Sequence, residues 1–113
     1  MIRQHDGNIL TIDGASFEMP FGIRQVIGED NLTFVLLAVP ASEQEIRNVY
    51  GFRDAEQIWQ VGSLNDQYPD RKNLPFEDIR RVDDGLLGRD FYGRQYLIDP
   101  MTGAIIRQIQ IVK

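Results

Sequence analysis

The chain has 113 residues, with 12 lysines and arginines, 17 aspartates and glutamates, and no cysteine. This length fits one ordinary domain, and 42% hydrophobic residues is normal for a globular protein. The lack of cysteine excludes disulfides, thiolate metal sites and cysteine nucleophiles, and it suits a cytoplasmic location. The formal net charge of −5 argues against nucleic acid and anionic membranes as partners, and it leaves room for a basic protein partner.

The chain shows no sign of a membrane segment or a leader. No apolar stretch approaches the roughly 18 residues of a membrane span, and the first residues lack the hydrophobic run of a signal peptide. We therefore expect one domain over residues 1–113 that stays where it is made. Residues 1–7 are expected to be frayed, and residues 62–75 are expected to form a long loop of the kind that is often functional or mobile.

The N-terminal half alternates β-type runs with turns. Asp13-Gly14 lies between two such runs and predicts a tight hairpin, because both turn positions favour a positive φ. A third strand is expected at 22–27. Residues 32–39 are apolar on both faces, which predicts a strand in the centre of a sheet. The spacing of Ser42 and Glu45 fits a capping box, which could begin a helix of one or two turns at most.

The C-terminal half repeats the pattern. Strands are expected at residues 48–52, 57–61, 86–91, 94–99 and 104–112. Between them, Phe76, Ile79 and Val82 are spaced at three, which slightly favours a helical turn over a strand. The fold class that follows is mainly β, with antiparallel hairpins forming two packed or continuous sheets and at most one or two short helical turns.

Two hairpins, at residues 48–59 and 96–106, share an aromatic strand, a turn and an aliphatic return strand. They resemble the blade hairpins of quinoprotein-type β-propellers. The order of elements over residues 8–110 also resembles that of small bacterial proteins that carry no assigned activity. These resemblances imply a β-rich fold and no particular reaction. A closed propeller needs at least four blades, which this length does not supply, so no quinone site and no other cofactor is expected.

Catalytic signatures are few. His5 is the only histidine, which argues against a Ser-His-Asp site or a histidine-rich metal site, and no phosphate-binding loop occurs. No metal site is expected. The best candidates for an enzyme are Asp83, Asp84, Asp90 and Asp99, although all of them also suit turns. A small-ligand or carbohydrate-binding domain, or a weak hydrolase using Asp83, Asp84 or Asp90, stays open. It predicts a concave pocket that holds at least two of these acids beside an aromatic platform.

The leading hypothesis is a non-enzymatic protein-interaction module, and an immunity-type protein that neutralises a basic toxin is one concrete version. It would present a sheet face or the 62–75 loop to its partner. Most aromatic residues are expected in the core. The candidate binding residues combine the aromatics expected at the surface with their charged neighbours: Trp59, Tyr68, Asp90, Tyr92 and Arg94.

The last strand raises the question of self-association. Residues 104–112 could form an exposed edge, with Ile109 and Ile111 on one apolar face. Such an edge can pair with the same strand of a second copy, which predicts a homodimer through this strand.

Overall fold

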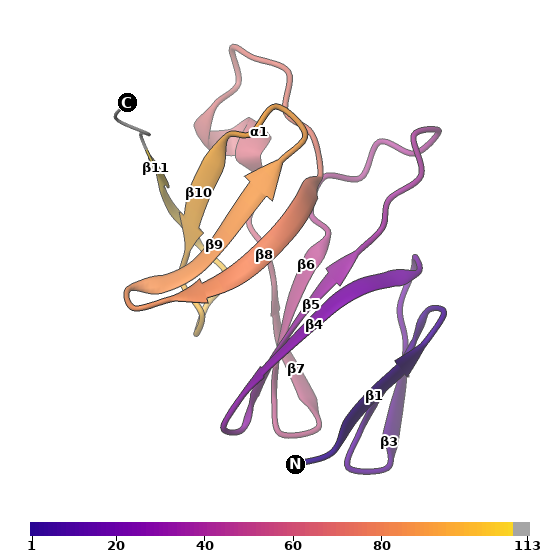
Figure 1. Cartoon of the computed structure of the whole chain (residues 1–113). Coiled ribbons are helices and arrows are strands. Elements are labelled where there is room, and N and C mark those ends of the chain that lie inside the picture. The colour runs from indigo at the N-terminus through magenta and orange to yellow at the C-terminus, as the bar shows by residue number, and fades with distance from the viewer. Residues whose placement is uncertain (110–113) are drawn as a thin grey trace.

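The structure is a computed structural model that describes residues 1–109, and Ile111 of the expected last strand lies outside them. Within these residues, eleven strands form three antiparallel sheets, and one short helix lies between the seventh and eighth strands (Figure 1). The prediction of a mainly β, antiparallel fold is confirmed, with three sheets where two were expected. In the part of the chain described, no helix is long and apolar enough to cross a membrane.

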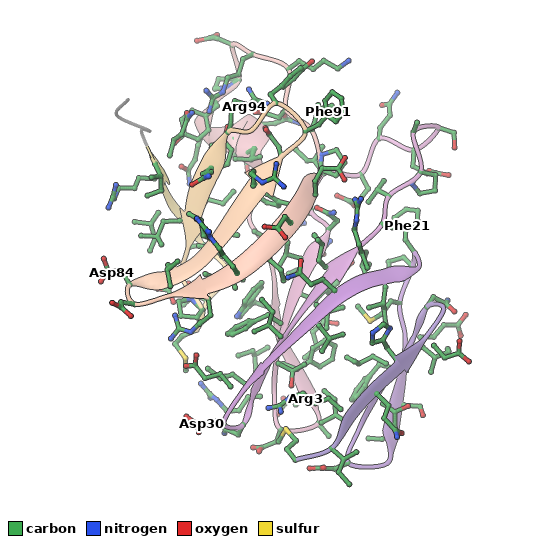
Figure 2. All side chains as sticks on the ribbon, in the orientation of Figure 1. Arg3, Phe21, Asp30, Asp84, Phe91 and Arg94 are labelled. Atoms are coloured by element: carbon green, nitrogen blue, oxygen red, sulfur yellow. The ribbon has the colours of Figure 1, made fainter. Side chains whose placement is uncertain are left out.

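The first sheet is formed by β1 (Arg3–Asp6), β2 (Ile9–Ile12) and β3 (Ala15–Glu18). The turn between β2 and β3 has positive φ at both Asp13 and Gly14, as the hairpin prediction requires. Within the N-terminal segment expected to be frayed, residues 3–6 form the paired strand β1. Arg3 pairs with Ile12 across β1 and β2, and its guanidinium donates to Thr33 Oγ1 at 2.8 Å and to the Leu32 carbonyl at 3.1 Å. These bonds hold the first strand against the second sheet (Figure 2).

The other two sheets are four-stranded meanders in which every strand pairs with its neighbours in sequence. The second contains β4 (Ile23–Glu29), β5 (Leu32–Leu37), β6 (Val49–Arg53) and β7 (Glu56–Gln60). The third contains β8 (Phe76–Val82), β9 (Gly85–Asp90), β10 (Gln95–Ile98) and β11 (Ile105–Ile109). The two hairpins that look alike in sequence thus form the third and fourth strands of successive sheets, and β11 is the outermost strand of the third sheet.

The second sheet is the middle layer of three, because β5 is buried on both faces. Phe34 and Leu36 belong to one core with residues of the third sheet. Val35 and Leu37 belong to the other core with residues of the first sheet. Alternate side chains of a strand point to opposite faces, so a single run of apolar residues serves both cores. The central position predicted for this strand is confirmed.

Neither of the two segments considered for a helical turn, residues 42–45 and the segment around Phe76, forms one. Residues 42–45 are irregular, because Glu45 accepts the Arg47 N–H at 2.7 Å instead of closing a capping box with Ser42. The one helix within residues 1–109 is α1 (Leu64–Gln67), inside the segment expected to be a long loop, and Ser63 Oγ caps it by accepting the Asn65 N–H at 3.2 Å.

The segment expected to favour a helical turn is strand β8. Phe76 and Ile79 are both buried in the core, although a regular strand would turn residues three apart to opposite faces. A shift of register between Phe76 and Asp78 inserts an extra residue, which restores the same facing. A bulge therefore explains the spacing of three between Phe76 and Ile79, whereas Val82 follows in regular register and does not belong to this core.

Two amide side chains join the third sheet to the second along the edge of β8. The buried Asn48 accepts the Phe76 N–H at 2.9 Å and donates through Nδ2 to the carbonyls of Phe76 at 2.9 Å and Leu37 at 2.8 Å. Gln25 accepts the Ile79 N–H at 3.0 Å and donates to the Ile79 carbonyl at 2.5 Å. Each amide thus presents to β8 the donor and acceptor that a neighbouring strand would present. Ion pairs between Arg24 and Glu77 and between Arg81 and Glu29 flank the joint.

We expect Asn48→Leu to lower the free energy of unfolding by about 3 kcal/mol, because it leaves three buried backbone groups without partners. Urea unfolding followed by tryptophan fluorescence measures this change. Gln44→Leu makes the same kind of substitution at an exposed side chain, and we expect a change within about 0.5 kcal/mol. Equal effects of the two substitutions would show that Asn48 does not hold the sheets together.

Candidate functional site

The turn between β9 and β10 carries an exposed aromatic pair. Phe91 is 73% exposed and Tyr92 is 57% exposed. The two ring centroids lie 6.1 Å apart and the ring planes are inclined at 68°. Figure 2 shows Phe91 projecting from the end of the third sheet. Adjacent exposed aromatic side chains are typical of surfaces that bind another molecule. We call these two residues the aromatic tip.

A buried ion pair fixes the base of the aromatic tip. Asp90 is fully buried, and its two carboxylate oxygens accept the Arg94 N–H at 3.0 Å and the Arg94 Nε–H at 2.7 Å. The Asp90 N–H also donates to the Arg94 carbonyl, and the Gly93 N–H donates to the Asp90 carbonyl, both at 3.0 Å. Charge-assisted bonds of this kind have a defined geometry. The ion pair therefore closes the turn and forces residues 91 and 92 outward.

Arg94 also links the turn to the 62–75 segment. Its Nη2 donates to the Lys72 carbonyl at 2.8 Å, and its Cζ lies 5.1 Å from the centre of the Tyr92 ring. A guanidinium over an aromatic face is attracted by the ring electrons. One side chain thus contacts the base of the turn, the exposed ring and the neighbouring segment.

The 62–75 segment is held by its own side chains. Arg71 lies over the Tyr68 ring, 4.2 Å from its centre, and donates to the Tyr96 hydroxyl at 2.7 Å and to Gln108 Oε1 at 2.8 Å. Asn73 donates to the Tyr68 carbonyl at 3.0 Å. The Tyr68 ring packs on the buried Tyr96 ring with centroids 5.6 Å apart. Tyr68 is therefore partly buried and anchors the segment.

A pocket of about 410 Å³ lies between this segment and the irregular chain that follows β5. Its lining combines apolar and polar side chains: Ala41, Glu43, Gln44, Ile46, Asn65, Lys72, Asn73, Leu74 and Pro75. Since Lys72 also receives the bond from Arg94, the pocket borders the base of the aromatic tip. Figure 1 shows the β9–β10 turn and both pocket-lining segments at the same end of the molecule.

Three of the five predicted binding residues come together in one turn: Asp90, Tyr92 and Arg94. Tyr68 lies in the adjoining segment. Trp59 does not belong to this surface, which corrects the prediction. It is 6% exposed, and its indole N–H donates to the Pro100 carbonyl at 2.9 Å.

Glycines explain the burial of Trp59. A Cβ on Gly51 would lie 2.1 Å from the indole ring, and one on Gly103 would lie 2.5 Å from it. Both positions must therefore lack a side chain for the ring to pack between the β6–β7 hairpin and the turn before β11. Gly103 also has φ +74°, which favours glycine independently.

Phe91 is the residue of this surface that the sequence did not indicate. It was expected to be the last residue of a strand, with the turn at residues 92 and 93. The turn begins one residue earlier, because Asp90 uses its carboxylate to bind Arg94. An acid and an arginine four residues apart around a glycine are the signal that could have located it.

Of the four candidate catalytic acids, Asp90 lies apart, because the pairing of Ile98 with Leu86 places Asp99 at the other end of β9, toward Asp83 and Asp84. Asp83 and Asp84 lie in the turn before β9, where Figure 2 labels Asp84, and Asp90 is the last residue of that strand. Six residues of strand separate the two ends by roughly 20 Å, whereas a pair of glycosidase carboxylates needs roughly 5 to 9.5 Å. Within residues 1–109, no three histidines, aspartates or glutamates are placed to hold a metal ion.

Fold and surface together define a three-layered antiparallel β domain with an exposed aromatic turn. The chain belongs to the family described as a domain of unknown function (DUF7957), whose model matches residues 1–109. No curated protein and no solved structure matches the chain.

We expect the stability of the protein to fall as the pH rises above about 10, which is the usual pKa of tyrosine. Burial raises the pKa of Tyr96 above this value, and the positive charges of Arg94 and Arg71 offset part of the rise. Burial and the charge of Glu45 also raise the pKa of Tyr50. The unfolded chain then ionises first, so the stabilisation is present below pH 10 and is lost as the pH rises through the folded-state pKa.

Urea unfolding at pH 8 to 11 measures this slope. Tyr96→Phe should make the slope shallower without abolishing it, and should cost about 1 kcal/mol at pH 8 because Arg71 loses an acceptor. Tyr92→Phe, at an exposed ring, is the matched control. An unchanged slope in Tyr96→Phe would contradict this assignment.

Proposed function

We propose that the chain is a non-enzymatic protein-interaction module and that its partner binds at the aromatic tip. The observation that supports this most directly is the exposure of Phe91 and Tyr92 on a turn closed by the buried Asp90–Arg94 ion pair. Interfaces gain most of their binding energy from a few residues, among which tyrosine, tryptophan and arginine are enriched, and the turn presents Tyr92 beside Arg94.

The fixed geometry of the turn strengthens the proposal. A flexible loop loses conformational freedom when a partner orders it, and this loss weakens binding. Arg94 reduces the loss by bonding Asp90 and Lys72 and by lying over the Tyr92 ring. The adjacent pocket would accept a side chain of the partner, with Ile46 and Leu74 supplying apolar contact.

The proposed partner is a basic protein, and the proposed role is of the immunity type, in which binding neutralises a toxin. The net charge of −5 favours a basic partner because opposite charges accelerate association. The test of this proposal begins from the aromatic tip.

A photo-crosslinking residue in place of Phe91, introduced in the cells that make the protein, should yield one discrete protein adduct. The same residue in place of Met101, which is 46% exposed on a different turn, should not yield that adduct. With the crosslinked protein purified, Phe91→Ser should weaken binding by roughly 30-fold, as loss of an interface anchor does. Met101→Ser should bind like the wild type.

Asp90→Asn tests whether binding depends on the geometry of the turn as well as on the two rings. It keeps both aromatic residues and removes the negative charge of the Asp90–Arg94 ion pair. We expect an intermediate loss of affinity, measured by titration calorimetry. The proposal fails if positions 91 and 101 give the same adducts, or if Phe91→Ser binds the purified protein as tightly as the wild type.

The 410 Å³ pocket supports a second candidate, a small-ligand or carbohydrate-binding domain. Its size lies within the usual range for ligand sites, and its lining mixes apolar and polar groups. A hydrolase is less well supported, since Glu43 is the one acid in the lining and the predicted acids lie elsewhere. Phe91→Ser leaves the pocket lining intact, so it should not affect a ligand bound there.

We also propose that β11 pairs with the β11 strand of a second copy. Among the residues that the structure describes, no strand pairs with the outer side of β11, and Ile106 on it is 49% exposed. Light scattering at high concentration should give a mass near twice 13.0 kDa. Ile106→Lys should restore the monomer, because a charge on an edge strand opposes pairing. A wild-type monomer at high concentration would contradict this mode of association.

A further inference from the structure

The outward face of the third sheet carries a second surface, which adjoins the aromatic tip at Arg89 and Gln95 but shares no residue with it. Its residues point away from the core that the third sheet shares with the second: Arg80, Leu87, Arg89, Gln95, Leu97 and Arg107. The register places Arg80 opposite Leu87, Leu87 opposite Leu97, and Leu97 opposite Arg107. One row across four strands thus has an arginine at each end and two leucines between them.

The two leucines are nearly covered although no other sheet of the described chain packs on them. Leu87 is 8% exposed and Leu97 is 6% exposed, yet neither belongs to either hydrophobic core. Arginine side chains shield apolar neighbours with their methylene groups and keep the guanidinium in water. A hollow of about 80 Å³ remains over Leu87, and Arg80, Arg89, Gln95 and Asp78 surround it.

The arginines of this face are not neutralised within residues 1–109. Arg24, Arg81 and Arg94 form ion pairs, whereas Arg80, Arg89 and Arg107 have no carboxylate within 4.0 Å in that part of the chain. The one acid on the face is Asp78, which lies opposite Arg89 in the register and offsets its charge. The face is therefore positive in a chain of net charge −5, and its uncompensated charges are Arg80 and Arg107.

From this arrangement we infer that the outward face of the third sheet binds an extended acidic segment of a protein, with an apolar residue between two carboxylates. Arg80 and Arg107 are three strand spacings apart, or roughly 14 Å. In an extended peptide, residues i and i+4 share one face and lie roughly 13 Å apart. Carboxylates at these positions would reach the two guanidiniums, which bind them in pairs of hydrogen bonds.

The apolar residue at i+2 of the bound segment falls over the leucines. It would enter the hollow above Leu87, and the segment would cross the strands of the sheet rather than extend them. A polyanion such as nucleic acid fits this face less well, because the leucine row offers nothing to phosphates and the net charge of −5 repels it. The surface is separate from the aromatic tip, so the inference does not depend on the proposed function.

The test uses the whole protein, labelled with ¹⁵N, and the peptide acetyl-Ser-Glu-Thr-Leu-Thr-Glu-Ser-amide at low salt. We expect saturable amide shifts in β8 to β11 and an affinity that falls with added salt. Arg80→Gln and Arg107→Gln should each weaken binding by about fivefold, the effect of losing one exposed charge pair. Arg53→Gln, at an exposed arginine of the second sheet, is the matched control and should bind like the wild type.

Asp78→Asn should bind the peptide about twofold more tightly, because it removes the one acid on this face. Damage to the fold would weaken binding, so a gain in affinity cannot come from damage. Peptides with glutamine in place of both glutamates, or with the glutamates only two residues apart, should bind at least fivefold more weakly. The inference is overturned if the wild type shows no saturable shifts. It is equally overturned if the arginine variants match Arg53→Gln, or if a short oligothymidylate binds this face more tightly than the peptide. Phe91→Ser should leave peptide binding unchanged, which separates this result from that of the aromatic tip.

Discussion

The three-layered arrangement depends on how the edge of β8 is joined to the middle sheet. A strand edge presents backbone donors and acceptors that must find partners once they are buried. Here the partners are two side-chain amides, Asn48 on Phe76 and Gln25 on Ile79. Because Asn48 also binds the Leu37 carbonyl, it connects β5 to β8 directly. A single buried side chain therefore contacts strands of both sheets.

Local chemistry made most of the strands predictable. The Asp13-Gly14 turn, the run of apolar residues in β5 and the Pro100 to Gly103 turn each specify a nearby conformation. The errors arose where distant residues decide the outcome. The bulge in β8 lies in the stretch of edge that Asn48 and Gln25 bind, and Arg3 ties β1 to Thr33 in the middle sheet. Neither contact has a signature within a few residues of its own position.

The candidate site was predictable to the same extent. Asp90, Tyr92 and Arg94 are neighbours in sequence, and turn chemistry places them together. Trp59 was misplaced because two glycines, one on the paired strand and one far along the chain, make room for its ring. The row of Arg80 and Arg107 depends on the pairing of four strands, which periodicity alone does not supply.

The order of the layers along the chain also matters while the protein is being made. The middle sheet is complete once Gln60 has been synthesised, but the strands that cover one of its faces extend to Ile109. About fifty residues separate the two events, or roughly 2.5 to 10 s of translation at 5–20 residues per second. During that interval Phe34, Leu36 and Trp59 lie on a sheet face with no third layer over it. During this interval the uncovered apolar face makes the nascent chain prone to aggregation. The same face is the surface to which a chaperone would bind.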